Sequence, residues 1–329
     1  MNSLIASSAF TPLVLQSAAG LRVEILPFGA TIISIQLDGQ ELTLRHTKLS
    51  DYQENQGYLG STIGRYANRI ARGILQFDDK LIQLETAGDM HCLHGGHGFS
   101  HRDWQVVLHE ADEVELYLYS PDGDSGFPGD VAVWQHIKLI NNELHISFRA
   151  KTQSSTVLSL TNHCYFNLDG SQDITNHLLQ IYAEQFLPVS TDLIPTGEVF
   201  NLEGSAFDFM QPTRMADKLA LEDPQLRFTN GFDHCFVFDA KSIGLKHMAT
   251  LSSLLSKIQL TVSSTLPGLQ FYSGQSLEAP FVPRQGLCLE AQHWPDAPNR
   301  DDFPSALLTK DKMYEHQIIY AFSKLCGTE

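Results

Sequence analysis

The stretch VELYLY at residues 114–119 alternates apolar and more polar positions with a period of two. Val114, Leu116 and Leu118 share one face if this stretch is extended, because successive side chains of a strand point to opposite faces. The stretch LHISF at residues 144–148 repeats the alternation. Both stretches are therefore predicted to be strands with one buried face.

Similar stretches recur along the chain, separated by turn clusters such as SPDGD at 120–124 and GFPGD at 126–130. Helical patterns are few, one at 50–55 behind Ser50 and one at 213–221 behind Thr213. This pattern is typical of an all-β protein, a large antiparallel β-sandwich or barrel with few short helices. No linker or repeat divides the sequence, so residues 1–329 are predicted to form a single domain. The further expected strands are 21–26, 31–37, 131–140, 156–161, 178–182, 234–238, 257–262 and 316–322.

The composition favours a globular protein that binds a neutral or cationic ligand. Hydrophobic residues make up 43% and charged residues 18% of the 329 residues, which argues against disorder. The 22 Lys and Arg against 38 Asp and Glu give a formal net charge of −16. Such a surface repels nucleic acid and anionic membranes, so neither is expected as a partner.

The cysteines and the N-terminus predict a cytoplasmic protein. The five cysteines, at positions 92, 164, 235, 288 and 326, are odd in number and form no C-x-x-C pair. That usage is typical of free thiols in a reducing compartment. The N-terminal MNSLIASSAF lacks a basic segment followed by a long apolar run, and no stretch of 18 apolar residues occurs.

Glu290 is a lone carboxylate in the run LCLEAQHW at 287–294, which leads into the turn PDAPN at 295–299. An acid at the end of an apolar strand either faces solvent or points into a cleft, where it can act as a base. On its own this position favours solvent, because most such carboxylates do no chemistry.

The segment MHCLHGGHG at 90–98 concentrates histidines and a cysteine, as zinc sites do. No distal ligand pair such as C-x-x-C or H-E-x-x-H accompanies it, so a metal site is not expected. The glycines suggest a loop that wraps a ligand while presenting His94. A plain turn with incidental surface histidines stays open as the alternative.

His163 belongs to the aromatic stretch TNHCYFNL at 161–168. Asn162 and His163 point to opposite faces of a strand. A histidine in such surroundings is usually a hydrogen-bonded core residue. It can also be a general acid, because the imidazole pKa moves readily with its environment.

Further polar residues stand where turns enter strands. The stretch GRYANRIARG at 64–73 holds three arginines, which suit either the hydroxyls of a sugar or structural pairing with acids. Asp233 and Gln270 follow glycine turns, and Trp294 offers an apolar platform for a sugar face. Such residues suit a neutral polyol, since each hydroxyl both donates and accepts.

Eight motifs in order resemble the aldose 1-epimerase (galactose mutarotase) family, over residues 28–323. They are GRYANRIARG from Gly64, CLHGGHGF from Cys92, GFPGD from Gly126, NHCYFNL from Asn162, FLPVSTDLIPTGEV from Phe186, FDHCF from Phe232, PGLQFYSG from Pro267 and LEAQHWPDAPN from Leu289. The resemblance implies a galactose mutarotase-like supersandwich, no cofactor or metal, and interconversion of the α and β anomers of a free hexose. It implies Glu290 as general base and His163 as general acid. By the same match, the substrate contacts are Asn68, Arg69, His94, Asp233 and Gln270.

The reaction requires such a pair. A base takes the proton of the anomeric hydroxyl while an acid protonates the ring oxygen, and the open aldehyde recloses on its other face. Burial would lower the pKa of His163, so we expect a nearby carboxylate, Glu290 or Asp233, to offset that effect. Two departures from the family pattern, His91 and Pro27-Phe28, remove no catalytic group.

Two rival functions stay open, a hexose-6-phosphate 1-epimerase and a non-catalytic sugar-binding or regulatory module. A phosphorylated substrate would require clustered Arg and Lys at the cleft. A binding module needs neither an acid nor a base, but an intact pair does not prove turnover. The sequence leaves open the preferred sugar and whether the protein is a monomer or homodimer.

Overall fold

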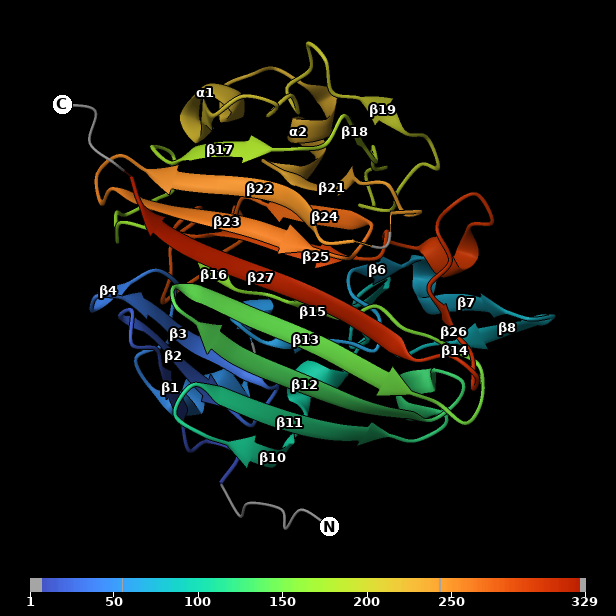
Figure 1. Cartoon of the computed structure of the whole chain (residues 1–329). Coiled ribbons are helices and arrows are strands. Elements are labelled where there is room, and N and C mark those ends of the chain that lie inside the picture. The colour runs from blue at the N-terminus through green and yellow to red at the C-terminus, as the bar shows by residue number, and fades with distance from the viewer. Residues whose placement is uncertain (1–7, 55, 243, 326–329) are drawn as a thin grey trace.

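The computed structural model describes residues 8–54, 56–242 and 244–325, which form mainly antiparallel sheets (Figure 1). The predicted all-β class is confirmed. The largest sheet has nine strands in the order β10-β11-β12-β13-β27-β23-β22-β17-β20, and every neighbouring pair is antiparallel. Its strands are β10 (Gln105–His109), β11 (Glu113–Ser120), β12 (Val131–Ile140), β13 (Glu143–Lys151), β27 (Tyr314–Lys324), β23 (Ile258–Ser264), β22 (Lys246–Ser253), β17 (Leu178–Ile181) and β20 (Thr213–Arg214).

The period of two decides which face of this sheet is buried. In β12, Val131, Val133 and Ile137 are fully buried and alternate with half-buried neighbours. Gln135 is the polar residue of the buried series, and its Oε1 accepts a hydrogen bond of 2.8 Å from Thr62 Oγ1. The sheet tolerates this buried amide oxygen because a partner replaces water.

Two further sheets complete the sandwich, and β24 and β25 lie behind the nine-stranded sheet in Figure 1. One hydrophobic cluster runs from Leu13 to Phe322 and joins all three sheets. The ring of Phe166 meets that of Tyr320 across the layers at 5.1 Å. The six-stranded sheet is β16 (Tyr165–Phe166), β25 (Leu287–Gln292), β24 (Gly268–Tyr272), β21 (Asp233–Val237), β18 (Gln185–Phe186) and β19 (Phe200–Asn201); the four-stranded sheet is β1 (Leu13–Gln16), β2 (Leu21–Leu26), β3 (Thr31–Leu37) and β4 (Gln40–Glu41).

Short ladders hold the connecting segments. They pair β14 (Thr156–Val157) with β26 (Leu307–Leu308), β15 (Thr161–Asn162) with β5 (Thr62–Ile63), β6 (Arg69–Ile70) with β9 (Cys92–Leu93), and β7 (Ile74–Phe77) with β8 (Lys80–Gln83). The predicted strand at 156–161 is therefore divided in two. It breaks because the chain changes partner: Leu158 N–H bonds to Ala306, and Ser159 N–H bonds to Arg65.

The helices are short, as predicted, but their bounds differ. The pattern at 50–55 is the 3-10 helix η1 (Leu49–Gln53), without a Ser50 side-chain cap, and residue 55 lies outside the described residues. The pattern at 213–221 splits into β20 and α1 (Met215–Leu219), and Thr213 caps nothing because its hydroxyl donates to Gln211. The helix α2 (Pro224–Thr229) was not predicted, although Asp223 before a proline is a typical helix start. The other 3-10 helices are η2 (Gln56–Tyr58), η3 (Ala71–Gly73), η4 (Phe99–His101), η5 (Asp124–Gly126) and η6 (Ala297–Asn299).

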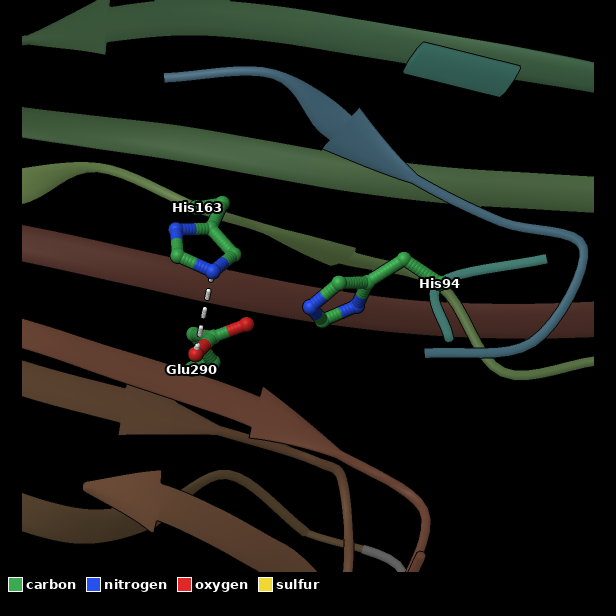
Figure 2. A group of neighbouring side chains, drawn as sticks. All are labelled: His94, His163 and Glu290. Carbon is green, nitrogen blue, oxygen red and sulfur yellow. Dashed lines mark ion pairs between the residues drawn. The ribbon is translucent and has the colours of Figure 1, made fainter. Parts of the chain in front are cut away.

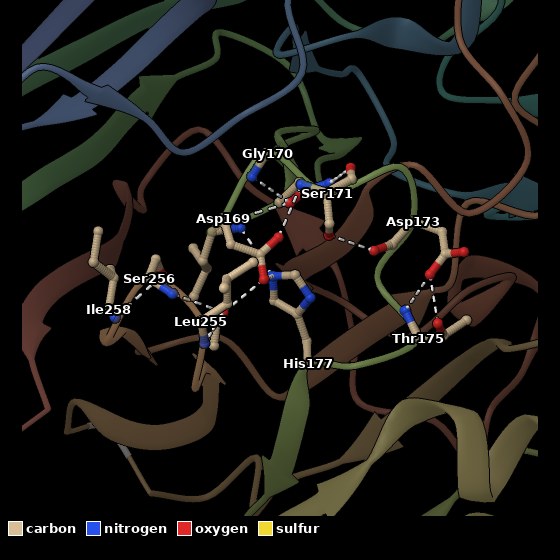
Figure 3. A network of polar contacts seen from close by, with 12 residues as sticks. Asp169, Gly170, Ser171, Asp173, Thr175, His177, Leu255, Ser256 and Ile258 are labelled. Carbon is tan, nitrogen blue, oxygen red and sulfur yellow. Dashed lines mark hydrogen bonds and ion pairs between the residues drawn. The ribbon is translucent and has the colours of Figure 1, made fainter.

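A partly buried polar network fixes the connection between β16 and β17 against the β22–β23 turn (Figure 3). Asp169 accepts hydrogen bonds from Ser171 N–H at 2.9 Å and from the Ser253 hydroxyl at 2.6 Å. His177 Nε2 accepts from Leu168 N–H at 3.0 Å, and burial lowers the pKa of His177. This histidine is therefore neutral, and its contact of 3.9 Å with Asp169 joins no pair of opposite charges.

Four of the five cysteines are free thiols in the described part of the chain, as predicted. Cys92, Cys164, Cys235 and Cys288 are buried and free, whereas position 326 lies outside the described residues, as does most of the N-terminal segment. Among the described residues, no helix has the length and apolar character needed to cross a membrane.

Candidate active site

A cavity of about 350 Å³ opens beside the carboxyl half of β25 and receives side chains from widely separated segments. Six of the seven predicted site residues line it: Asn68, Arg69, His94, His163, Asp233 and Glu290. The tertiary structure thus gathers groups that are up to 222 positions apart in the chain. Its other lining residues include Tyr58, Tyr165, Leu193, Thr229, Tyr272, Gln275, Leu277, Glu278 and Phe281.

His94 enters the cavity from a tight glycine loop. Its own φ is 53° and that of Asn68 is 68°, values that most side chains avoid. A Cβ on Gly95 would lie 2.5 Å from Gly64 O, so the loop requires glycine there. Non-glycine residues held at positive φ concentrate at functional sites, where the surrounding fold offsets the strain.

The backbone sets the tautomer of His94. Its Nδ1 accepts a hydrogen bond of 3.2 Å from Asn68 N–H, so the hydrogen of the neutral ring is on Nε2. Burial, and then the nearby His163 and Arg69, hold the pKa of His94 well below its usual value. His94 is therefore a neutral hydrogen-bond donor toward the cavity.

His163 and Glu290 face each other across the cavity, as Figure 2 shows, with 3.7 Å between His163 Nε2 and Glu290 Oε1. His163 follows the short strand β15, and Glu290 lies in β25 with 2% of its surface exposed. Glu290 is thus not the solvent-facing acid that its position alone favoured. Its Oε2 has no hydrogen-bond partner among the described residues.

Burial reverses the usual order of the two pKa values. Burial, reinforced by Asp233, raises the pKa of Glu290 well above its usual value, against an opposing effect of Arg69. Burial lowers the pKa of His163 to about 4, although a backbone hydrogen bond opposes the fall. We expected a neighbouring carboxylate to offset this burial. Glu290 is in place, but that expectation was wrong because desolvation outweighs the other contributions.

Asp233 is fixed by two other predicted residues. Arg69 Nη1 lies 3.5 Å from Asp233 Oδ2, and Gln270 Nε2 donates a hydrogen bond of 2.6 Å to Asp233 Oδ1. Gln270 is 3% exposed and does not line the cavity. It therefore orients Asp233 and does not itself reach a ligand in the cavity. Trp294 lines a separate cavity, which rules out the sugar platform predicted for it.

Aromatic side chains that were not predicted as site residues form walls of the cavity. The ring of Tyr58 lies 4.6 Å from that of His94, and the ring of Tyr165 lies 5.1 Å from that of His163. Tyr165 belongs to the motif that supplies His163, which is a usable signal. Tyr58 and Tyr272 carry no such signal, because only the tertiary fold brings them to the cavity.

The other two arginines of the GRYANRIARG motif lie elsewhere. Arg65 is 2% exposed and donates to backbone carbonyls, among them Pro128 O at 3.0 Å and Pro121 O at 3.1 Å. It fixes the loop after β11, so its role is structural. Arg72 donates its backbone N–H to His91 Nδ1 at 2.9 Å, which places the His91 departure in loop bonding beside the site.

His94, His163 and Glu290 each offer one potential metal-ligand atom, all within 4.8 Å of one another. A zinc ion takes a histidine nitrogen that has a free lone pair. His94 Nε2 carries its hydrogen because Nδ1 is occupied by Asn68 N–H. The donor set therefore fits a hydroxylated ligand better than a metal ion.

Comparisons with known proteins show the family of this chain. The family model described as Aldose 1-epimerase matches residues 12–321. The chain belongs to the aldose 1-epimerase family. The resemblance read from the eight motifs is confirmed.

Members of the aldose 1-epimerase family resemble this chain over almost its whole length. It is 38% identical to an aldose 1-epimerase of Escherichia coli, over 89% of this chain and 88% of that protein. It is also 38% identical to human galactose mutarotase, over 92% and 91% of the two chains. A solved aldose epimerase homologue from C. elegans superimposes with a TM-score of 0.89 at 28% identity, covering 96% and 99%.

Proposed function

We propose that this protein is an aldose 1-epimerase that interconverts the α and β anomers of a free hexose such as galactose or glucose. The observation that carries the proposal is the buried pair of His163 and Glu290, 3.7 Å apart across a cavity lined with polar groups. The identity to named aldose 1-epimerases and galactose mutarotases supports the same activity.

Glu290 is the proposed base and His163 the proposed acid. Burial raises the pKa of Glu290 and lowers that of His163 to about 4, so at a pH between the two pKa values the free pair holds one proton, on the carboxyl. Moving that proton to His163 creates the carboxylate and imidazolium that ring opening requires, without a proton from solvent. A sugar hydroxyl that donates to the unpartnered Oε2 of Glu290 stabilises the charged form.

Ring opening and closure then use the same two groups in opposite directions. Glu290 takes the proton of the anomeric hydroxyl while His163 protonates the ring oxygen. The free aldehyde turns about the bond to its neighbouring carbon. For reclosure, His163 takes back the hydroxyl proton, and Glu290 protonates the aldehyde oxygen. Each such transfer contributes about a hundredfold to ten-thousandfold, and the chemistry requires no cofactor because water performs the reaction slowly.

The remaining groups are proposed to hold the sugar. Asn68, Arg69, His94 and Asp233 line the cavity, and His94 offers an Nε2 hydrogen while Asp233 offers acceptors. Gln270, which does not reach the cavity, orients Asp233. The aromatic rings of Tyr58 and Tyr165 bound the cavity and exclude water from the reacting atoms.

A phosphorylated substrate is the less favoured alternative. Arg69 is the one Lys or Arg among the described residues that line the cavity, and it is already paired with Asp233. Asp233 and Glu278 place acidic groups there. A phosphate dianion would meet repulsion from these carboxylates.

Cellular location and domain organisation remain part of the proposal. Four buried free thiols in the described part of the chain favour a reducing compartment such as the cytoplasm. The core cluster that runs from Leu13 to Phe322 favours one domain.

Polarimetry tests the proposal directly. Freshly dissolved α-galactose or α-glucose is followed with wild type, Glu290→Gln and His163→Gln. The wild type should accelerate the drift to equilibrium, and each variant should lose most of that acceleration. A wild type that binds the sugar in calorimetry without accelerating the drift would establish the binding module instead. Faster turnover of the 6-phosphate sugar would establish the phosphosugar epimerase.

A further inference from the structure

Cys288 and Glu290 face the two nitrogens of the same imidazole. They are two residues apart on β25, so their side chains leave the strand on the same face. Cys288 Sγ lies 3.5 Å from His163 Nδ1, and Glu290 Oε1 lies 3.7 Å from His163 Nε2. Cys288 is fully buried and does not line the cavity, so it acts on a substrate only through His163.

We propose that Cys288 is a positioning residue whose sulfur accepts a hydrogen bond from His163 Nδ1–H, leaving Nε2 as the nitrogen that exchanges a proton with Glu290 and the sugar. This inference rests on the proposed function and adds a residue to it. The hydrogen bond made by one ring nitrogen determines whether the other nitrogen carries a hydrogen. In His94 the result is the reverse, because Nδ1 accepts from Asn68 N–H and the hydrogen is on Nε2.

The catalytic cycle requires an acceptor at Nδ1. The imidazolium carries hydrogen on both nitrogens, and it keeps the Nδ1 hydrogen after Nε2 has given its proton to the ring oxygen. A partner that accepts at Nδ1 therefore suits both states, whereas a partner that can only donate there suits neither. A thiol meets this requirement by turning its own hydrogen away.

The surroundings keep that thiol uncharged and the ring in place. Burial, reinforced by the nearby Glu290, raises the pKa of Cys288 well above its usual value, so no thiolate forms. Aromatic rings pack against the imidazole at 5.1 Å from Tyr165 and 6.0 Å from Tyr58. The titratable groups that face the imidazole are Tyr58, His94, Tyr165, Cys288 and Glu290.

The test compares Cys288→Ala, Cys288→Ser and the control Cys235→Ala, which removes another buried free thiol, whose sulfur donates to Phe236 O instead. Loss of an orienting partner costs about tenfold or more in activity, so kcat of Cys288→Ala should fall about tenfold. KM should stay within about twofold because Cys288 does not line the cavity. Cys288→Ser keeps an acceptor and should retain most of the rate, and Cys235→Ala should retain all of it.

Nitrogen-15 NMR of the His163 ring provides a readout that packing damage alone does not move. The wild type should show hydrogen on Nδ1 and a free lone pair on Nε2, and Cys288→Ala should show a mixture of the two tautomers. A wild-type ring with hydrogen on Nε2, or a Cys288→Ala ring and kcat identical to wild type, would overturn the proposal. If Cys288→Ala does not fold, the wild-type tautomer and the rate of Cys288→Ser still test the role of Cys288. The tautomer is measured without turnover, so failure of the Cys288 proposal can be distinguished from failure of the proposed function.

Discussion

Gln270 lies directly opposite Glu290 in the β24–β25 ladder, yet its amide group donates to Asp233 on the other neighbouring strand. Gln270 Oε1 and Glu290 Oε2 are both buried, and neither has a hydrogen-bond partner in the described part of the chain. Three adjacent strands thus carry Asp233, the Gln270 amide that bonds to it, and Glu290, whose Oε2 lacks a partner in the described chain. A hydroxylated ligand completes the bonding that the fold leaves open at Glu290.

Glu290→Gln should lose activity and gain stability. Loss of the base should lower kcat by about a hundredfold to ten-thousandfold in polarimetry. Burial raises the pKa of Glu290 in the folded state, so the unfolded chain, with a carboxyl pKa of about 4.3, releases this proton first as pH rises. The wild type therefore loses stability above about pH 4.3, and Glu290→Gln does not lose this contribution. Thermal melts at about pH 5 and about pH 8 should show the advantage of the variant growing with pH. An advantage that shrinks with pH would contradict the raised pKa.

The pH dependence of the rate should report the proton held by the pair. Below the His163 pKa of about 4 both groups are protonated and no base remains, so kcat/KM should fall there. Above the raised pKa of Glu290 the pair has lost its single proton, and kcat/KM should fall again. Initial rates across this range check both limbs. A profile without a limb on the alkaline side would mean that the pair does not supply the acid.

Gln270→Ala should weaken substrate binding more than it slows the chemistry. The 2.6 Å hydrogen bond from Gln270 orients Asp233, and a bond to a charged group is worth about 1.5–3 kcal/mol, so KM should rise at least about tenfold. Gln292→Ala is the matched control, since Gln292 is fully buried, lies in β25 and has no partner for its side-chain amide within the ranges that the structure describes. Equal KM changes in the two variants would refute a specific role for Gln270.

Gly95→Ala should distort the loop that presents His94. Gly95 and Gly88 have similar φ values of 82° and 89°, so alanine is strained at both. Only at Gly95 does the new Cβ meet backbone, 2.5 Å from Gly64 O, whereas nothing lies within 4 Å at Gly88. Denaturant unfolding should show Gly95→Ala less stable than Gly88→Ala by about 1–3 kcal/mol, because overpacking adds to the common backbone strain. Equal losses would mean that the loop relaxes freely.

A chelator should leave the activity unchanged. The hydrogen bond from Asn68 N–H to His94 Nδ1 leaves no lone pair on Nε2 for a metal ion. Dialysis against EDTA, followed by polarimetry, checks this expectation. Activity that disappears on dialysis and returns with zinc would show that the His94, His163 and Glu290 triad binds metal.

The strand pattern by itself determined the fold class and the location of most long strands. In β12 and β13 each residue has one of two faces, and burial follows the alternation. The same local rules failed at 156–161, where the chain changes its hydrogen-bonding partner strand. They also failed at the short helices, where a few tertiary contacts outweigh weak caps. The ordered motifs named the site residues, but they could not separate Gln270, which holds Asp233, from the residues that line the cavity.

Only the tertiary structure decided the state of the site. A carboxylate in LCLEAQHW has no particular pKa until neighbouring strands bury it, and then desolvation raises that pKa while it lowers the pKa of His163. Likewise, Asn68 N–H selects the tautomer of His94 from 26 residues away in the chain. Side-chain alternation is a local property, so the sequence determines it directly. Desolvation and hydrogen bonding depend on which distant segments pack together, so they exist only in the folded molecule.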